Sequence, residues 1–536
     1  MLFIIYYLIL HSSFFILHSN CIIFAAEIVY TTLSQMEDIL ASTVVVKSHK
    51  SNSLINRKMI FRILGVLLHV EGLMFVISMF VALAYGEEDA MHFLLAAVIT
   101  EAAAFLLQYL GKGAPNNISR RDGYCIVAFT WVLFTVFGMI PSISSGEIPD
   151  VTNAFFETMS GFTTTGATVL SNIDDLSHAM LFWRSLTQWI GGLGIIFFTV
   201  AFLPIFGLGN QVLFSAEATG VSHDKIHPKI SVMGKWIWTI YICITAACFC
   251  LLLLGGMGFF DAVCHSFSTA ATGGFSTKGA SVAYFDSPFA EYVISAFMII
   301  AGINFSLYFL CLKGQFRHLW KNEEVRLYLG TIFVLTIAIG ISLYVYNGYD
   351  AEKAFRKSLF QVASILTSCG FATDDYNQWM PFTWLLLVYA MITGGCTGST
   401  CAGIKCMRIL IIFKNIRNEF NRRIHPRAVL PVKINGQTVT PGVISTVSTF
   451  ALFYLCILFV GWVLIMAMGV DFMDAFGVTV SSLCNIGPAL GHFGPEYSWD
   501  ALPDLGKWLT SFYMLIGRLE LFAVLLMFAP GFWRKS

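Results

Sequence analysis

Runs of threonine, serine and glycine recur four times in the chain, each after a segment of similar length and composition. The segments read NAFFETMSGFTTTGAT (153–168), DAVCHSFSTAATGGFS (261–276), KSLFQVASILTSCGFA (357–372) and DAFGVTVSSLCNIGPA (474–489). Aligned without gaps, they bring four glycines into register, each 13 residues after the polar residue that opens its segment: Gly166, Gly274, Gly370 and Gly487. Glycine lets the backbone turn its carbonyl oxygens toward a ligand, and rings of carbonyls can replace the hydration shell of a monovalent cation. The four glycine runs hold no carboxylate, which argues against a divalent-cation site built from acidic side chains.

The elements that must position these glycines are membrane-spanning helices. Of the 536 residues, 57% are hydrophobic and only 12% are charged, whereas an ordinary soluble domain has about 25% charged residues. Because a span needs about 20 apolar residues, we predict an all-α polytopic membrane protein with ten spans after residue 60. They cover 62–85, 91–110, 124–143, 180–205, 236–256, 288–312, 327–346, 382–411, 443–468 and 508–529.

The loops between these spans alternate in charge, which predicts their orientation. Basic residues gather in 112–121, 225–235, 313–326 and 414–433 and at the C-terminus, whereas the other loops are acidic or mixed. Basic loops stay in the cytoplasm, so both ends of the 59–536 body are expected inside and the four glycine runs outside. The formal net charge is zero, and no nucleic-acid partner is indicated.

Each glycine run follows about ten moderately apolar residues, too few to span the bilayer. A re-entrant half-helix is tolerated there if it lines a water-filled cavity. We therefore predict four units of span, pore helix, filter loop and span around one central pore with pseudo-fourfold symmetry. Helix dipoles would then direct their negative ends at a central cation. The predicted units are 116–210, 211–315, 316–425 and 426–536, preceded by two additional helices in 59–115 and by an N-terminal extension, 1–58, of doubtful status.

The stretches TTTGAT, ATGGFST, TSCGFATDD and NIGPALG, each after a pore half-helix, resemble the four filters of the Trk/Ktr/HKT potassium transporter superfamily. The two additional helices before the first unit are similar to those of its TrkH branch. The resemblance covers about 59–536 and implies that filter-loop carbonyls hold potassium, with the filter glycine critical for selectivity. The residues that it assigns to this role are Thr164, Thr165, Gly166, Thr272, Gly273, Gly274, Ser368, Cys369, Gly370, Asn485, Ile486 and Gly487.

A second glycine-rich stretch, MITGGCTGSTCAGIK at 391–405, interrupts a predicted span. Such a run does not hold a continuous helix cheaply, and broken helices at membrane depth mark transport pathways; the alternative is a passive kink between packed helices. The resemblance implies an intramembrane loop that blocks the pore and an arginine, in the GRLE context of Arg518, that forms a barrier beneath the filter. Lys405 is a candidate to add to this barrier, and for both cations the alternative is a structural ion pair. The gate residues are Gly394, Gly395, Thr397, Gly398, Ser399, Thr400, Gly403, Lys405 and Arg518.

The function that the resemblance implies is potassium uptake at a cell inner membrane. A secondary transporter of another monovalent cation or small solute is the alternative, although such folds usually show inverted or twofold repeats. No HExxH, GxSxG or P-loop motif indicates an enzyme, and no cofactor is expected. Four titratable residues in or near membrane segments are either proton relays or packing residues: His69, Glu71, Glu101 and His265. The resemblance implies a homodimer and a cytosolic nucleotide-binding regulator of the TrkA type, and neither the coupling ion nor the regulator's ligand follows from the sequence.

Overall fold

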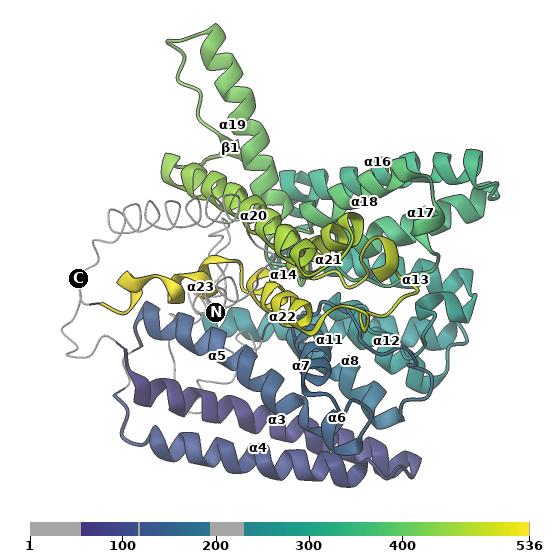
Figure 1. The fold of residues 1–536 in the computed structure, drawn as a ribbon. Helices are drawn as coiled ribbons and strands as arrows, with labels where there is room; N and C mark the ends of the chain where they lie inside the picture. The colour runs from purple at the N-terminus through teal and green to yellow at the C-terminus, as the bar shows by residue number, and fades with distance from the viewer. Residues whose placement is uncertain (1–54, 116–117, 193, 195–229, 535–536) are drawn as a thin grey trace. The chain divides into compact units, whose positions relative to one another are not determined.

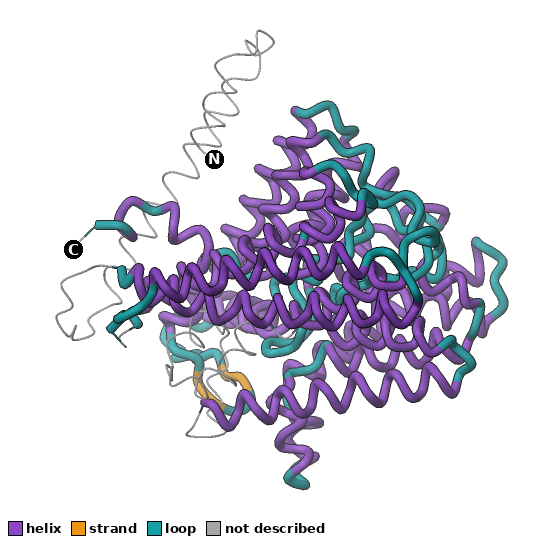
Figure 2. The backbone as a smooth tube through the Cα atoms, turned by 90° about the horizontal axis from the view of Figure 1, so that it is seen from below, coloured by secondary structure: helices purple, strands orange, loops and turns teal. Residues whose placement is uncertain are grey.

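The computed structural model describes residues 55–115, 118–192, 194 and 230–534, and in these parts the regular secondary structure is almost entirely helical (Figure 1). The strands in the described residues are one short antiparallel pair, β1 (Lys433–Ile434) and β2 (Gln437–Thr438), drawn orange in Figure 2. Residues 55–524 form one compact unit. The most N-terminal prediction, the extension 1–58, lies almost wholly outside the described residues.

Six helices in the described part of the chain are long and apolar enough to cross a membrane, or up to eight if each bent pair counts as one span. This confirms the prediction of an all-α, multi-pass membrane protein. The first two pack against each other and precede the first glycine segment, as predicted for the additional helices. The six are α3 (Arg57–Tyr85), α4 (Ala90–Leu110), α5 with α6 (Arg120–Gly138 and Ile140–Ser145), α11 (Ile230–Leu254), α16 (Glu323–Tyr346) and α20 (Pro441–Ala467).

Two predicted spans are not continuous, which corrects the sequence interpretation. The predicted span 288–312 is divided into α13 (Pro288–Ala301) and α14 (Phe305–Leu312), which meet at 93°. Asn304 starts α14 afresh, because its side-chain oxygen accepts the N–H of Ser306 at 2.8 Å. The predicted span 508–529 ends early, since α22 (Asp504–Arg518) stops at Arg518 and the next residues include Glu520 and Leu521 at positive φ. Apolar composition alone did not reveal either break.

Of the two remaining predicted spans, the structure describes 382–411 in full and 180–205 in part. Helix α18 (Pro381–Thr393) ends at the glycine-rich stretch, and α19 (Cys406–Ile424) begins after it, so the predicted interruption of 382–411 is present. Helix α8 (His178–Gly192) accounts for the first part of 180–205. The part of that span from residue 195 onward lies outside the described residues.

The four predicted half-helices are present: α7 (Val151–Phe162), α12 (Phe259–Ala271), α17 (Ala351–Leu366) and α21 (Phe472–Cys484). At 1.5 Å per residue, helices of 12 to 16 residues are about 18–24 Å long, too short for a hydrocarbon core of about 30 Å. Each packs against the helix that follows the glycine segment of another unit: α7 on α22, α12 on α8, α17 on α13, and α21 on α18. These contacts join the fourth unit to the first, the first to the second, the second to the third and the third to the fourth. The exact boundaries between the units stay a prediction.

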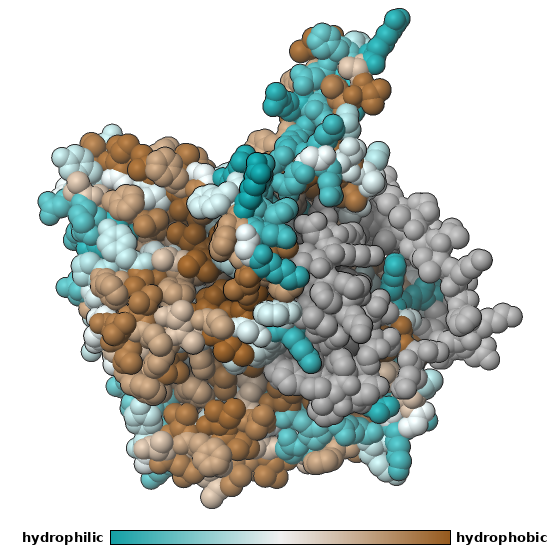
Figure 3. Space-filling view, turned by 180° about the vertical axis from the view of Figure 1, so that it is seen from behind, coloured by the Kyte–Doolittle hydropathy of each residue, from teal (hydrophilic) through white to brown (hydrophobic). Residues whose placement is uncertain are grey.

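Helix α19 leads away from the body and connects to the β1–β2 hairpin (Figure 1). Asn435 and Gly436, both at positive φ, form its tight turn, as the Asn-Gly pair favours. Figure 3 shows broad hydrophobic areas on one face of the body, with hydrophilic side chains gathered on the projecting segment. The remaining short elements are η2 (Ser281–Phe285), α15 (Phe316–Lys321), η3 (Tyr376–Gln378), η4 (Gly491–Phe493), α23 (Phe522–Leu525), η5 (Leu526–Phe528) and η6 (Pro530–Phe532).

Candidate ion pathway

The four predicted filter loops share one backbone conformation. Two residues before each aligned glycine, a non-glycine residue adopts the left-handed region: Thr164, Thr272, Ser368 and Asn485, with φ between 51° and 53°. The aligned glycines Gly166, Gly274, Gly370 and Gly487 also have positive φ, between 80° and 100°. A left-handed non-glycine residue costs about 1–2 kcal/mol, and such strain gathers where function requires it. The same cost is repeated at four equivalent positions, which makes these loops the candidate functional site.

The residue between these two positions is fixed by a hydrogen bond to its own pore helix. Its N–H donates to a serine carbonyl five residues earlier, at 2.8–3.0 Å: Thr165 to Ser160, Gly273 to Ser268, Cys369 to Ser364 and Ile486 to Ser481. These four serines are in the same register as the glycines, a second shared position that the sequence analysis did not use. Each middle residue thus has its N–H bound to its own pore helix, and its carbonyl oxygen is available for a contact outside that helix.

Those carbonyls lie against the aligned glycine of another unit. A β-carbon on Gly166 would lie 2.2 Å from the carbonyl oxygen of Gly273. The corresponding distances are 2.1 Å from Gly274 to Cys369, 1.9 Å from Gly370 to Ile486 and 2.7 Å from Gly487 to Thr165. The contacts run from the first unit to the second, third and fourth, and from the fourth back to the first. We call these eight residues the filter ring. Only glycine fits at the four contact positions, because any side chain would overlap a carbonyl oxygen.

All four aligned glycines line one cavity of about 490 Å³, counting the space open to solvent. The charged residues among its described lining are Arg184 and Lys278. Arg184 forms a buried ion pair with Glu157 at 2.9 Å, and Lys278 lies 3.9 Å from Asp174. Each cation is thus near a carboxylate of its own, and the filter ring contributes its four glycines to the lining of the cavity.

The polar residue that opens each aligned segment binds the chain near the filter loops. Asp261 accepts the Thr277 hydroxyl at 2.6 Å, and Lys357 donates to the Thr373 carbonyl at 2.9 Å. In the first unit Asn153 donates to Asp500, a residue before α22, at 3.3 Å. In the sequence these positions served only to align the four segments. In the structure their side chains form the hydrogen bonds described here.

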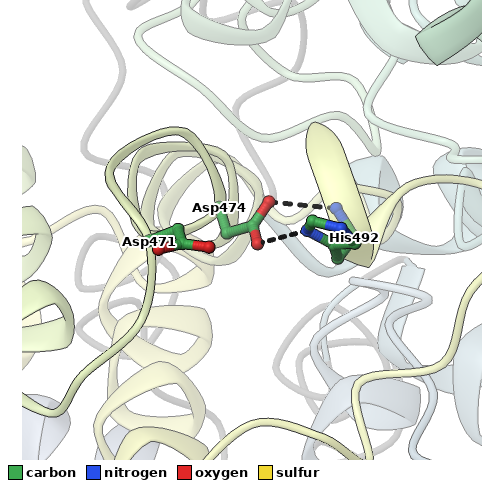
Figure 4. Close-up of side chains that lie close together, drawn as sticks. All are labelled: Asp471, Asp474 and His492. Atoms are coloured by element: carbon green, nitrogen blue, oxygen red, sulfur yellow. Dashed lines mark hydrogen bonds and ion pairs between the residues drawn. The ribbon is translucent and has the colours of Figure 1, made fainter.

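In the fourth unit Asp474 holds the loop through His492 (Figure 4). Its carboxylate accepts the His492 backbone N–H at 2.9 Å and contacts the imidazole Nδ1 at 2.8 Å. The hydrogen bond to Asp474 raises the pKa of His492 above its usual value. Asp471 lies nearby, so these three residues could hold a metal ion by geometry. The bonds between Asp474 and His492 already account for the arrangement.

Two buried ion clusters brace the pore helices, and the sequence analysis missed both. Besides Arg184, the carboxylate of Glu157 accepts the Thr168 hydroxyl and the Val169 N–H, each at 3.0 Å. On α13, Glu291 binds Arg356 at 2.6 Å and Lys357 at 2.9 Å. The partners are far apart in sequence, so no local spacing signals these pairs.

The glycine-rich loop, residues 394–405, touches the filter loops directly. The Thr272 hydroxyl bonds to the Thr400 hydroxyl at 3.1 Å, and Ser368 Oγ accepts the Ala402 N–H at 2.9 Å. The loop turns at left-handed residues, including Gly398, whose carbonyl accepts the Phe305 N–H at 3.0 Å. Among the predicted gate residues, Thr400 therefore lies nearest the filter by direct contact. The glycines at 394, 398 and 403, all at positive φ, account for the break in the helix.

Arg518 lies at the C-terminal end of α22, not in the middle of a span as predicted. Its guanidinium donates to the Thr400 carbonyl at 2.6 Å and to the Gly192 carbonyl at the end of α8, also at 2.6 Å. Glu520, two residues further on, pairs with Lys405 at 2.8 Å and with Arg408. Lys405 thus has the ion pair that was the alternative to a barrier role.

The four candidate proton-relay residues have separate surroundings. His69 pairs with Glu101 at 2.5 Å. The ring nitrogens of His265 contact the Asp261 carbonyl at 2.8 Å and the Ser276 hydroxyl at 3.0 Å. Glu71 is fully buried, and within the described residues its carboxylate oxygens have no hydrogen-bond partner. The described contacts do not connect these groups into a chain, so a proton relay stays a prediction.

Membrane-spanning helices, together with half-helices whose following loops line one cavity, are typical of a multi-pass transport protein for small ions. Comparison with known proteins identifies which one. A family model described as TrkH, a cation transport protein, matches residues 89–535. The chain therefore belongs to the TrkH cation transport family, which confirms the resemblance seen in the sequence and, because these proteins are transporters, the expectation that it is not an enzyme.

Individual relatives agree with this assignment. The Trk system potassium uptake protein TrkH of Escherichia coli (strain K12) is 38% identical over 481 residues, covering 89% of this chain and 99% of the relative. The TrkG protein of the same organism, also named a Trk system potassium uptake protein, is 35% identical over 88% of this chain and 97% of its own length. The crystal structure of the potassium transporter TrkH from Vibrio parahaemolyticus matches with a TM-score of 0.81 and 34% identity, covering 89% of this chain and 99% of that one.

Proposed function

We propose that this protein is the potassium-translocating subunit of a Trk-type uptake system in the cell inner membrane, with both ends of its 59–536 body in the cytoplasm. The filter ring carries the proposal. Its glycine-to-carbonyl contacts pass through all four units and return to the first, as a pore of pseudo-fourfold symmetry requires. The relatives named potassium uptake proteins support the choice of ion.

In this proposal, potassium loses its hydration shell to backbone carbonyls of the four loops. The ligands are carbonyl oxygens of the filter residues listed above, and the aligned glycines keep side chains out of the lumen. The C-terminal ends of α7, α12, α17 and α21 add the negative ends of four helix dipoles. The absence of carboxylates among the described residues lining the cavity favours a monovalent cation over a divalent one.

The glycine-rich loop is the proposed gate. It bonds to Thr272 and Ser368 of the filter loops, and Arg518 ties it to α8 and α22. For ions to pass, the loop and the Arg518 guanidinium must leave these positions. A nucleotide-binding regulator of the TrkA type, acting on the basic segment around α19, is the proposed driver of that movement, and the transporter is proposed to work as a homodimer.

The experiment that tests the function is potassium uptake by a cell that lacks its own uptake systems. The expected result is restored growth at low potassium when the chain is expressed with a TrkA-type regulator, together with rubidium uptake into liposomes that hold the purified protein. Amino acid uptake without rubidium uptake would favour the small-solute alternative. Confirmed membrane expression with neither growth nor flux would refute the proposal.

A further inference from the structure

One buried carboxylate holds the glycine-rich loop and belongs to none of the predicted site residues. Glu324, in the first turn of α16, is only 2% exposed. Its Oε1 accepts the backbone N–H of Thr397 at 2.6 Å and that of Met407 at 3.1 Å. Thr397 lies within the loop, whereas Met407 lies at the start of α19. A single oxygen therefore joins the loop to the helix that follows it.

The loop closes on itself at its base without help from Glu324. Lys405 N–H donates to the Thr393 carbonyl at 2.9 Å, and Cys406 N–H donates to the Gly395 carbonyl at 3.0 Å. These bonds fix the two ends of the loop to each other. The bond from Thr397 to Glu324 instead fixes the part of the loop that leads to the filter. Loss of Glu324 would therefore release the Thr397 amide and weaken the hold on this part, which keeps its bonds through Gly398, Thr400 and Ala402, and would leave the base intact.

Glu324 also supplies an acceptor that α19 needs. The first N–H groups of a helix have no partner within it, and Met407 is the second residue of α19. A carboxylate at a helix N-terminus also interacts favourably with the helix dipole. A movement of α19 would thus act directly on the group that holds the loop.

The same turn of α16 binds other parts of the projecting segment. Glu323 pairs with Lys414 of α19, and its N–H donates to the Asn435 side chain in the hairpin turn at 2.9 Å. Asn322 caps α16 by accepting the Glu324 N–H at 2.9 Å. The start of α16 is therefore the place where the hairpin, α19 and the loop meet.

From these contacts we infer that Glu324 is a positioning residue that keeps the glycine-rich loop in its flux-blocking place and couples it to α19. The inference rests on the proposed function, because it takes the loop to be the gate. Glu324 acts through the Thr397 and Met407 amides and need not touch the ion.

The test compares Glu324→Ala, Glu324→Gln and the control Glu323→Ala in the full-length protein. Glutamine keeps a carbonyl oxygen that can accept both N–H groups, whereas alanine keeps none. The control breaks a half-exposed contact of the same turn with α19 and leaves the loop bonds in place. Each variant is purified, checked for a monodisperse folded state, and measured for rubidium flux, rubidium-over-sodium preference and hydrogen exchange.

The expected result for Glu324→Ala is flux increased on the order of tenfold, an unchanged ion preference, and faster exchange at the Thr397 and Met407 amides but not at the Lys405 and Cys406 amides. Glutamine should lie between alanine and the wild type, and Glu323→Ala should match the wild type. Unchanged exchange in Glu324→Ala would overturn the inference. Faster exchange with unchanged flux would also overturn the inference, because the loop would then not be the gate. That result would leave the filter ring, and with it the proposal of potassium selection, unaffected.

Discussion

Replacing Gly166 with alanine should damage the filter ring far more than its backbone angle alone would suggest. The new β-carbon would lie 2.2 Å from the Gly273 carbonyl oxygen, whereas real contacts of this kind essentially never fall below 3.0 Å. The carbonyl must therefore retreat by about 0.8 Å, which withdraws it from the place where it would bind an ion. If that contact is worth about as much as a hydrogen bond to a charged group, roughly 1.5–3 kcal/mol, potassium preference should fall by about 10–150-fold.

The matched control for this variant is Gly146→Ala. Gly146 has φ of 83°, close to the 81° of Gly166, but a β-carbon there would meet nothing within 4 Å. Both variants carry the same left-handed strain of about 1–2 kcal/mol, so a difference between them reports the carbonyl contact alone. The assay is rubidium and sodium flux into liposomes with each purified variant. Equal potassium preference in Gly166→Ala and Gly146→Ala would refute the filter ring as the selective element.

Three further predictions concern the residues around the filter. Arg184→Leu leaves the buried Glu157 carboxylate without its cation and should lower the free energy of unfolding by about 3–5 kcal/mol, seen as a lower thermal midpoint. The double variant Glu157→Gln with Arg184→Gln should recover most of this stability. Because the pKa of His492 is raised, its bond to Asp474 contributes its full stability below the unfolded pKa of about 6.5, and this stability is lost as the pH rises through the folded pKa. NMR titration should place the His492 midpoint above 6.5, and Asp474→Asn should lower that midpoint. Arg518→Ala should increase rubidium flux. Arg518→Lys should resemble the alanine variant, because an ammonium lacks the planar guanidinium geometry that reaches carbonyls on two elements. Wild-type flux in the lysine variant would favour a role for charge alone.

The four glycine loops could be predicted from the sequence because their signal is local and repeated. Glycine is required where a β-carbon would overlap a carbonyl oxygen, and Gly166 and its equivalents each lie 13 residues after the polar residue that opens the aligned segment. The spans could be predicted because long apolar runs have few alternatives in a bilayer. Both signals are visible in one chain without any three-dimensional information.

The holding contacts could not be predicted, because they join residues that are distant in sequence. Glu324 binds Thr397 across 73 positions, and no pattern along α16 marks it as different from an ordinary acidic first turn. The bends at 302–304 and after Arg518 were also missed, since each break consists of only a few residues between apolar runs. Arg518 was recognised by its charge, but its carbonyl partners depend on where α8 and the loop lie.

The contacts of the filter ring also determine how a change in one loop affects the others. Each aligned glycine lies against a backbone carbonyl of the following unit. Because only the carbonyl oxygen makes this contact, the contact does not restrict the side chain of the residue that bears the carbonyl. This explains how Thr165, Gly273, Cys369 and Ile486 can differ while the four glycines do not. Because all four units belong to one polypeptide, a substitution enters the ring in a single dose, where a pore of four identical subunits would receive it four times. In this protein, a single substitution can therefore measure the contribution of one of the four proposed filter loops while the other three stay unchanged.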